Sequence, residues 1–434
     1  MRRRTGGGPD DAAGGAGIDG SADGSADGLV DSIPRALTRR DSLRKLHHVK
    51  NVGMLSSLCL LINAQIGPGI PFTPLLFQEA GWLVPIIAFA VFAVVSSFSV
   101  LFLVEAMQAL PGNRHFQGTV EYATLINFYF GKWWHVVGQV FLYGALQANA
   151  IQSIVLCAQS FDYILLDLFG SNCGIAFDQG PLCVYKHALP PNAAVSPFGD
   201  ARMCVTGGFL LLIGVASFLG RYNLDETMIV QKITLFLTLM IAFYWIGGSA
   251  SLPLQPLPVC RTQGLAHITG TIMLNLAYST VVPSWVNIKT AQVSVQRTVW
   301  TATGGAALLY VVMSLLPAMA LQITDPSGNV LAAIKASLPP KLLARISIDA
   351  FAIGMLAPAI PVNFIVSRHN LVQNGVLAHR WATAACFVVP WLVAMPMLTG
   401  SVLQDFVTWS SLIFVGTANF VIPLLIYLKA VRFR

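Results

Sequence analysis

Ten apolar runs, each about long enough to cross a lipid bilayer, constrain this 434-residue chain more than any other feature of its sequence. Hydrophobic residues make up 55% of the chain, charged residues only 10%, and the mean hydropathy is +0.67. A membrane-spanning helix needs about 20 mostly apolar residues, and it satisfies its backbone hydrogen bonds internally. We therefore predict an all-α polytopic membrane protein. The predicted spans are residues 54–77, 82–110, 134–169, 203–219, 228–250, 265–287, 298–322, 344–367, 380–399 and 402–428.

The basic residues predict which side of the membrane holds the chain ends. With the amino terminus in the cytoplasm, nineteen of the 26 lysines and arginines fall in cytoplasmic segments and six on the opposite face, while Lys232 lies at a span edge. Cytoplasmic loops are enriched in these residues, so both termini are predicted to be cytoplasmic. The topology accounts for the net charge of +7, and the lipid bilayer, not nucleic acid, is the predicted partner. Oligomeric state stays open.

Two segments of different composition predict the domain organisation. Residues 1–48 are rich in Gly, Ala, Asp and Ser, include the near-repeat SADGSADG at 21–28, and have little apolar material to pack. Such a composition is typical of disorder, so we predict a disordered cytoplasmic tail. Residues 49–430 hold all the predicted spans and form the predicted transmembrane domain.

Cysteines and motifs bound the chemistry. Cys173 and Cys183 lie in a loop on the predicted outer face, where the compartment is oxidising, and are candidates for a disulfide. No metal-binding spacing of Cys or His is present, and no HExxH or GxSxG motif points to an enzyme. We therefore predict no metal, no cofactor and no catalytic residues.

The first predicted span contains an unusual interruption, NAQIGPGIPFTP, at residues 63–74. Proline lacks a backbone donor and glycine favours non-helical torsions, so this cluster should break the helix near its centre. The sixth span has a similar interruption at Tyr278, Ser279 and Thr280, before Pro283. Broken helices at matching positions of two five-helix halves indicate an inverted repeat with a binding site between them. This interpretation is favoured over a simple proline kink.

Four stretches resemble a known family: NAQIGPGIPFTPLLFQEAGW, LFLVEAMQALPGN, YATLINFYFGKWWH and LNLAYSTVVPSWVNIK. They resemble the amino acid/auxin permease family, within the amino acid, polyamine and organocation transporter superfamily. The resemblance extends over about residues 48–430. It implies an amino acid transporter with the LeuT-type fold, a 5+5 inverted repeat with spans one and six broken. Members typically have eleven spans, whereas ten are predicted here.

The resemblance implies that the substrate binds at the two breaks. The main chain of the first break is expected to hold the substrate carboxylate, and the second break its ammonium and side chain. Two polar residues of span three either line the cavity or bond to other helices. The substrate-binding candidates are Ile66, Gly67, Pro68, Gly69, Ile70, Tyr278, Ser279, Thr280, Asn149 and Gln152.

Three further residues are candidates for coupling or gating. Asn63 resembles a family position near the site or ion pathway, and Asn363 is the mid-to-late polar group of span eight. Glu105 is either a proton-coupling carboxylate or, preferably, a residue of the cytoplasmic gate. In sodium-coupled relatives, hydroxyls of span eight bind the ion, but residues 350–364 have no Ser or Thr. A proton gradient is therefore favoured over sodium as the driving force.

Other functions stay open at this point. An amino-acid-sensing transceptor and a sodium-coupled symporter fit the same features, whereas a channel lacks a filter-like repeat. The membrane could be plasma, vacuolar or lysosomal. The predicted function is proton-coupled, secondary active transport of amino acids by alternating access.

Overall fold

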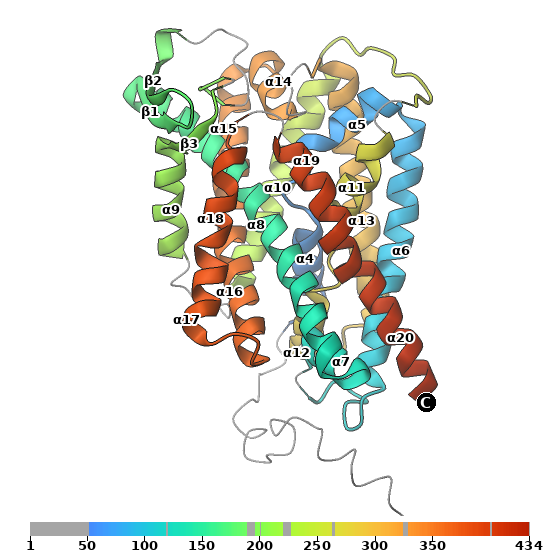
Figure 1. Cartoon of the computed structure of the whole chain (residues 1–434). Helices are drawn as coiled ribbons and strands as arrows, with labels where there is room; N and C mark the ends of the chain where they lie inside the picture. Colours follow the sequence, from blue (N-terminus) through green and yellow to red (C-terminus); the bar gives the residue numbers. More distant parts are fainter. Residues whose placement is uncertain are drawn as a thin grey trace, which may run out of the picture. The chain divides into compact units, whose positions relative to one another are not determined.

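The structure is a computed structural model that describes residues 52–118, 120–188, 196–199, 201–219, 227–262, 265–323, 329–399 and 402–433. The predicted disordered tail, residues 1–48, lies outside the described residues. The described chain is mostly helical (Figure 1).

The first predicted span is broken where its glycines and prolines cluster. Helix α4 (Met54–Gln65) ends at Ile66, which is extended, and the short 3-10 helix η1 (Ile70–Phe72) leads into α5 (Thr73–Ala80). The two halves are bent by 52°. Pro71 and Pro74 stand at the first turns of η1 and α5, where a missing N–H costs little.

The sixth predicted span is also two helices. Helix α11 (Leu265–Asn275) and helix α12 (Val282–Ile288) are separated by the non-helical residues 276–281. Each piece is too short to cross a bilayer alone.

The remaining helices are mainly long and apolar. Five of them are single helices: α6 (Leu83–Gln108), α8 (Lys132–Phe169), α9 (Gly207–Leu219), α10 (Thr227–Ala250) and α13 (Val295–Ala320). Two others are continued through π-helical turns: α15 (Lys341–Phe351) leads through one such turn into α16 (Ala357–Gln373), and α19 (Val402–Ser410) leads through two into α20 (Ile422–Phe433). Between these two lies the pair α17 (His379–Phe387) and α18 (Val389–Ala394).

By length and composition, seven helices of the described chain could each cross a membrane, or eight if the bent pair α4 and α5 counts as one span. Helix α9 is apolar but shorter, and α11 and α12 are short halves. The chain is thus a multi-pass membrane protein, and the count of ten spans stays a prediction.

The prediction of an all-α chain is wrong for the loop after α8. Strands β1 (Ser171–Ala176), β2 (Gly180–Tyr185) and β3 (Met203–Thr206) form an antiparallel sheet in the order β2-β1-β3. The predicted disulfide pair, Cys173 and Cys183, is directly opposed in the hairpin and bonded at 2.04 Å. These strands are only four to six residues long, too short for their sequence to reveal them, and the pairing between them holds the sheet together.

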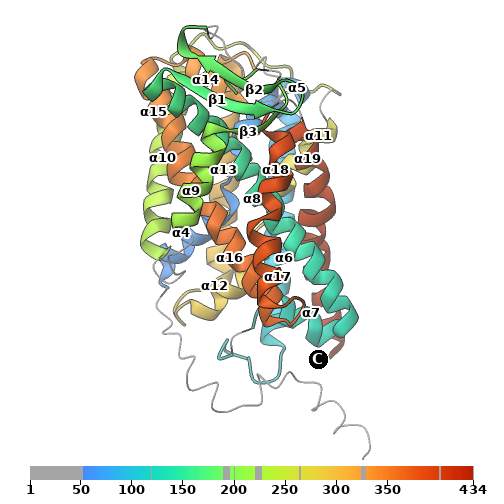
Figure 2. The same ribbon diagram turned by 60° about the vertical axis from the view of Figure 1, so that its left-hand side comes forward.

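Different elements lie at the two ends of the helix bundle (Figures 1 and 2). The sheet lies with α5, α14 (Val330–Ser337) and the start of α15 at one end, which we call the sheet end. At the other, the α7 end, lie α7 (Tyr122–Phe130), α12 and the end of α20. Helix α8 runs through the centre: 72% of its apolar window is buried, against 28–50% for the other span-length helices.

Candidate functional site

The break in the first span is held by side chains from two other helices. The Tyr310 hydroxyl of α13 donates to the Gln65 carbonyl at 2.8 Å and accepts from the Gly67 N–H at 3.3 Å. The Gln152 side-chain amide of α8 donates to the Pro68 carbonyl at 3.2 Å. The backbone groups that the break releases are therefore partly satisfied within the protein, as buried backbone polar groups require.

The two breaks meet at Gly69 and Asn275. A Cβ atom built on Gly69 would lie 1.7 Å from the Asn275 side-chain oxygen, so a larger residue at position 69 requires the Asn275 side chain to move. Asn275 is the last residue of α11, and α11 packs against α5. Residues that are about 200 positions apart in the chain are thus in contact, while the inverted repeat stays a prediction.

The sixth-span break is fastened on its other sides. The Tyr278 hydroxyl lies 2.6 Å from the Thr303 hydroxyl of α13, and the Tyr278 side chain is fully buried. The Ser279 hydroxyl donates to the Asn419 carbonyl at 2.9 Å, and the Thr280 N–H donates to the Asn419 side chain at 3.3 Å. In this conformation the polar groups of these residues bond to Thr303 of α13 and to Asn419.

Three buried polar atoms beside the breaks have no hydrogen-bond partner in the described chain: Gln65 Oε1, Gln152 Oε1 and Asn275 Nδ2. The two glutamine oxygens are acceptors and the asparagine nitrogen is a donor. Unpaired buried polar groups are costly and rare, so a ligand that supplies both an ammonium and a carboxylate would satisfy them.

Space at the break is limited in this conformation. A hollow with an enclosed volume of about 0 Å³ is lined by Ile66 and Ile70 of the break and by Leu309, Tyr310 and Met313 of α13. Ligand pockets typically measure about 300–1,000 Å³. Helices around the break must move apart before a substrate can enter.

The other sequence-predicted residues lie around the breaks at different distances. Asn149 is half-buried three residues before Gln152, on the same face of α8. Asn63 donates to the Gln231 carbonyl and side-chain oxygen, both at 2.7 Å, which ties α4 to α10. Asn363 is half-buried in α16.

Glu105 lies in the last turn of α6, near α7, because the Tyr129 hydroxyl of α7 donates to the next carbonyl, that of Ala106, at 2.9 Å. Its position is thus at the α7 end and not at the level of the breaks. This placement fits a gate residue better than a direct contact to substrate.

The α7 end is closed by contacts to α12. Val52 exchanges backbone hydrogen bonds with Ile288 and Thr290, at 3.4 and 3.1 Å. The Glu121 carboxylate accepts from the Ser284 hydroxyl at 2.9 Å and from the Asn287 amide at 3.3 Å. Burial raises the pKa of Glu121, and these two hydrogen bonds oppose the rise.

Sequence reasoning did not single out Tyr310, Asn275, Asn419 and Glu121. Each is a polar side chain in or beside an apolar helix, which is the signal that marks functional positions in membranes. That signal does not tell which of many such residues point toward the breaks.

Within the described residues, no group of three or more His, Cys, Asp or Glu side chains could hold a metal ion.

Residues 50–186 match the family described as transmembrane amino acid transporter protein. No individual curated protein matches the chain. The matched segment includes the first-span break, α6, α7, α8 and the hairpin. Proteins of this family are transporters and not enzymes, and the family implies an amino acid as the small-molecule substrate. The match confirms, over residues 50–186, the resemblance to an amino acid permease family that the sequence motifs predict.

Proposed function

We propose that the chain is a secondary active transporter that carries amino acids across a membrane by alternating access. The substrate binds at the unwound parts of the first and sixth spans. The observation that best supports this site is the contact of the two breaks, where the Asn275 side chain occupies the space that a Cβ at position 69 would fill.

The chemistry of the breaks fits the two ends of an amino acid. The substrate carboxylate would accept from the main-chain amides of Gly67 and Gly69 and from Asn275 Nδ2, near the positive ends of η1 and α5. The ammonium would donate to Gln152 Oε1 and to carbonyls that the breaks release. Substrate entry would displace the bonds from Tyr310 to Gly67 and from Gln152 to Pro68.

The driving force that we propose is a proton gradient. Sodium needs several oxygen ligands, and residues 350–364 of the eighth predicted span carry no hydroxyl. The Ser347 hydroxyl, one of the nearest, accepts from the Trp245 ring at 2.9 Å and donates to the Ala344 carbonyl at 2.7 Å. It is thus already engaged in bonds that hold α10 to α15.

Orientation follows from the basic residues. We place both termini and the α7 end in the cytoplasm, so the sheet end faces outside or into the lumen of a vacuole or lysosome. The disulfide between Cys173 and Cys183 supports this side for the hairpin, because disulfides persist in oxidising compartments.

The test is uptake of labelled amino acids by the purified full chain in proteoliposomes, with an imposed proton gradient, a sodium gradient or neither. Accumulation driven by the proton gradient alone is the expected result. Accumulation driven only by sodium would overturn the proton assignment and keep the transport function. Binding without uptake under any gradient would replace transport with amino acid sensing.

A further inference from the structure

A cavity of the described residues lies at the sheet end, away from the breaks. Its enclosed volume is about 40 Å³, and it is lined by α8, α14 and α15. We call it the sheet-end pocket and define it by Gln159, Tyr163, Lys335, Arg345 and Asp349. Small-molecule sites typically measure about 300–1,000 Å³, so the helices around this pocket must move apart before a small molecule can enter.

The sheet-end pocket lies on the side of the break that faces the sheet. Helix α14 packs on η1, and the α8 residues that line the pocket begin at Leu156, one turn after Gln152. From Gln152 to Gln159 the rise along α8 is about 10 Å. A ligand in the pocket is therefore separate from a ligand at the breaks, yet adjacent to it.

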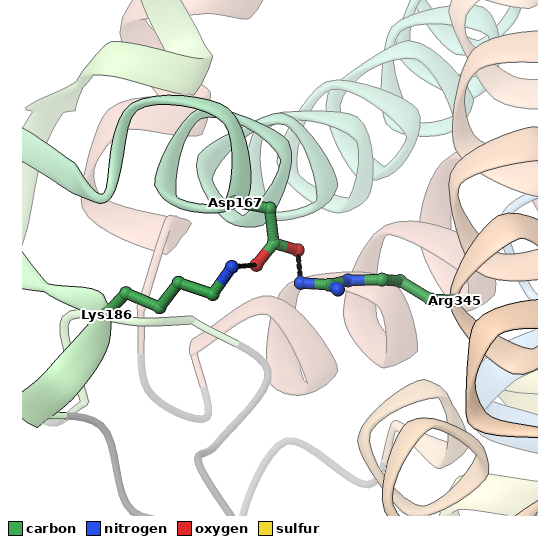
Figure 3. Close-up of polar contacts among 3 residues, drawn as sticks. All are labelled: Asp167, Lys186 and Arg345. Atoms are coloured by element: carbon green, nitrogen blue, oxygen red, sulfur yellow. Dashed lines mark ion pairs between the residues drawn. The ribbon is translucent and has the colours of Figure 1, made fainter.

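One carboxylate at the pocket is already neutralised. Asp167, at the end of α8, pairs with Lys186 at 3.3 Å and with Arg345 of α15 (Figure 3). Lys186 directly follows β2 of the hairpin. The pair fixes the start of α15 against α8 and leaves the Nε–H of Arg345 buried without a hydrogen-bond partner in the described chain.

A second cation faces the same space. The Lys335 ammonium of α14 lies 3.4 Å from the centre of the Tyr163 ring. Burial lowers the pKa of Lys335 to about 8, opposed by the Asp349 carboxylate and assisted by Lys186. Lys335 and Asp349 act on each other electrostatically, but these two described residues form no direct ion pair. The Lys335 ammonium and the Asp349 carboxylate therefore line the same pocket without a direct contact between them.

The pocket also holds acceptors. Gln159 is only 7% exposed, and its side-chain amide donates to the Leu398 carbonyl at 3.0 Å. Its Oε1 is buried without a partner in the described chain. Together with the Asp349 carboxylate, this oxygen can accept from an ammonium group.

We propose that the sheet-end pocket is a second amino acid site, in which Lys335 and Arg345 Nε hold the carboxylate of the ligand and Asp349 and Gln159 hold its ammonium. The choice of an amino acid as ligand rests on the proposed function. The proposed binding mode is based on a buried donor and a buried acceptor without partners in the described chain, Arg345 Nε and Gln159 Oε1, and on the separated charges of Lys335 and Asp349. A zwitterion satisfies all of them, whereas an anion or a cation alone leaves one pair unsatisfied.

The first experiment is equilibrium binding to the full chain in lipid nanodiscs, with tritiated leucine, glutamine, glutamate and arginine tested singly. Wild-type protein is expected to bind two ligands per chain, and Lys335→Met one. The matched control is Lys341→Met, which removes an exposed lysine of α15 outside the pocket and should bind two. Two ligands retained by Lys335→Met, or one or none bound by the wild type, would overturn the second site.

A second set of variants separates this proposal from the transport proposal. In Gly69→Ala, binding at the breaks is lost and one ligand should remain. Adding Lys335→Met should then weaken that remaining binding by about tenfold or more, and adding Lys335→Arg should not. Size-exclusion chromatography checks that each variant is folded. A wild type that fails to transport but keeps Lys335-dependent binding would sink only the transport proposal.

Charge at Lys335 also predicts the pH dependence of this binding. The charged and titratable groups that face it are Asp349, Lys186, Arg345, Asp167 and Tyr163. Lys335 loses its proton as pH rises past about 8, so binding at the pocket should fall there in wild-type protein and persist in Lys335→Arg. Equal pH profiles for the two proteins would rule out Lys335 as the carboxylate ligand.

Discussion

At the scale of single residues, Gly69 lies where the two breaks meet. Its neighbour is the side-chain amide of Asn275, whose carbon and both terminal atoms would all lie within 2.9 Å of an added Cβ. Contacts closer than 3.0 Å require one of the partners to move. The contact between the breaks therefore depends on the missing side chain.

We predict that Gly69→Ala abolishes or strongly reduces uptake because the methyl group separates the two breaks. Proteoliposome uptake under a proton gradient measures the effect. The control is Gly247→Ala, on the exposed face of α10, where an added Cβ meets nothing within 4 Å; its uptake should equal that of the wild type. Normal uptake by folded Gly69→Ala would remove the breaks as the substrate site.

Buried side-chain amides lie beside the breaks. Gln152 donates one hydrogen bond but leaves its Oε1 without a partner in the described chain, and Asn275 leaves its Nδ2 without one. Such groups are stable in a membrane protein only when a ligand, water or a movement of the helices satisfies them during the working cycle.

At the scale of helices, α13 holds the broken span in place. It packs against both α4 and α5, and Tyr310 bridges the gap between them from Gln65 to Gly67. A single phenol thus replaces a missing turn of backbone hydrogen bonds. Phe89 stacks on its ring at 5.5 Å, which fixes the orientation of the hydroxyl.

Tyr310→Phe should lower the free energy of unfolding by about 1–3 kcal/mol, because it leaves buried backbone groups of the break unpaired. Thermal unfolding in detergent measures this loss. Tyr185→Phe on the exposed edge of the hairpin is the control and should change stability little, since Tyr185 is 59% exposed. Unchanged stability in Tyr310→Phe would show that water satisfies the break instead.

Elements also show how far sequence reasoning reached. The first-span break was predictable because two glycines and three prolines disfavour a helix wherever the chain folds. The β-hairpin was not, because short strands are stabilised by their cross-strand partners more than by their own composition. The division of the sixth span into α11 and α12 fits the predicted interruption at Tyr278, Ser279 and Thr280.

At the scale of the whole molecule, the α7 end is the closed side. Glu121 at the start of α7 accepts from two side chains of α12, and Val52 pairs with the residues that follow α12. If the helices move as alternating access requires, these contacts must break when this side opens.

Glu121 makes the closed state sensitive to pH. Its pKa is raised in the folded protein, so the folded state binds this proton more tightly than the unfolded state. Its stabilising contribution is full below the ordinary carboxyl pKa and is lost as pH rises through the raised value. We expect wild-type thermal stability to fall across that interval more than the stability of Glu121→Gln.

The measurement is the melting temperature as a function of pH in detergent. Asp178→Asn, which alters an exposed acid in the hairpin turn, is the control and should follow the wild-type profile. A Glu121→Gln profile parallel to that of the wild type would exclude Glu121 as a proton-sensitive contact of the α7 end.

The sequence by itself determined the class of protein, most of the long apolar helices, the place of the first break and the cysteines of the hairpin. These features follow from local composition, because the bilayer and the backbone impose the same constraints on every chain. Only the tertiary structure decided which groups face the break. Gly67 and Tyr310 are 243 positions apart and Gln152 and Pro68 are 84 apart. Such contacts depend on how helices pack side by side, which no local pattern specifies, and the sheet-end pocket between α8, α14 and α15 arises in the same way.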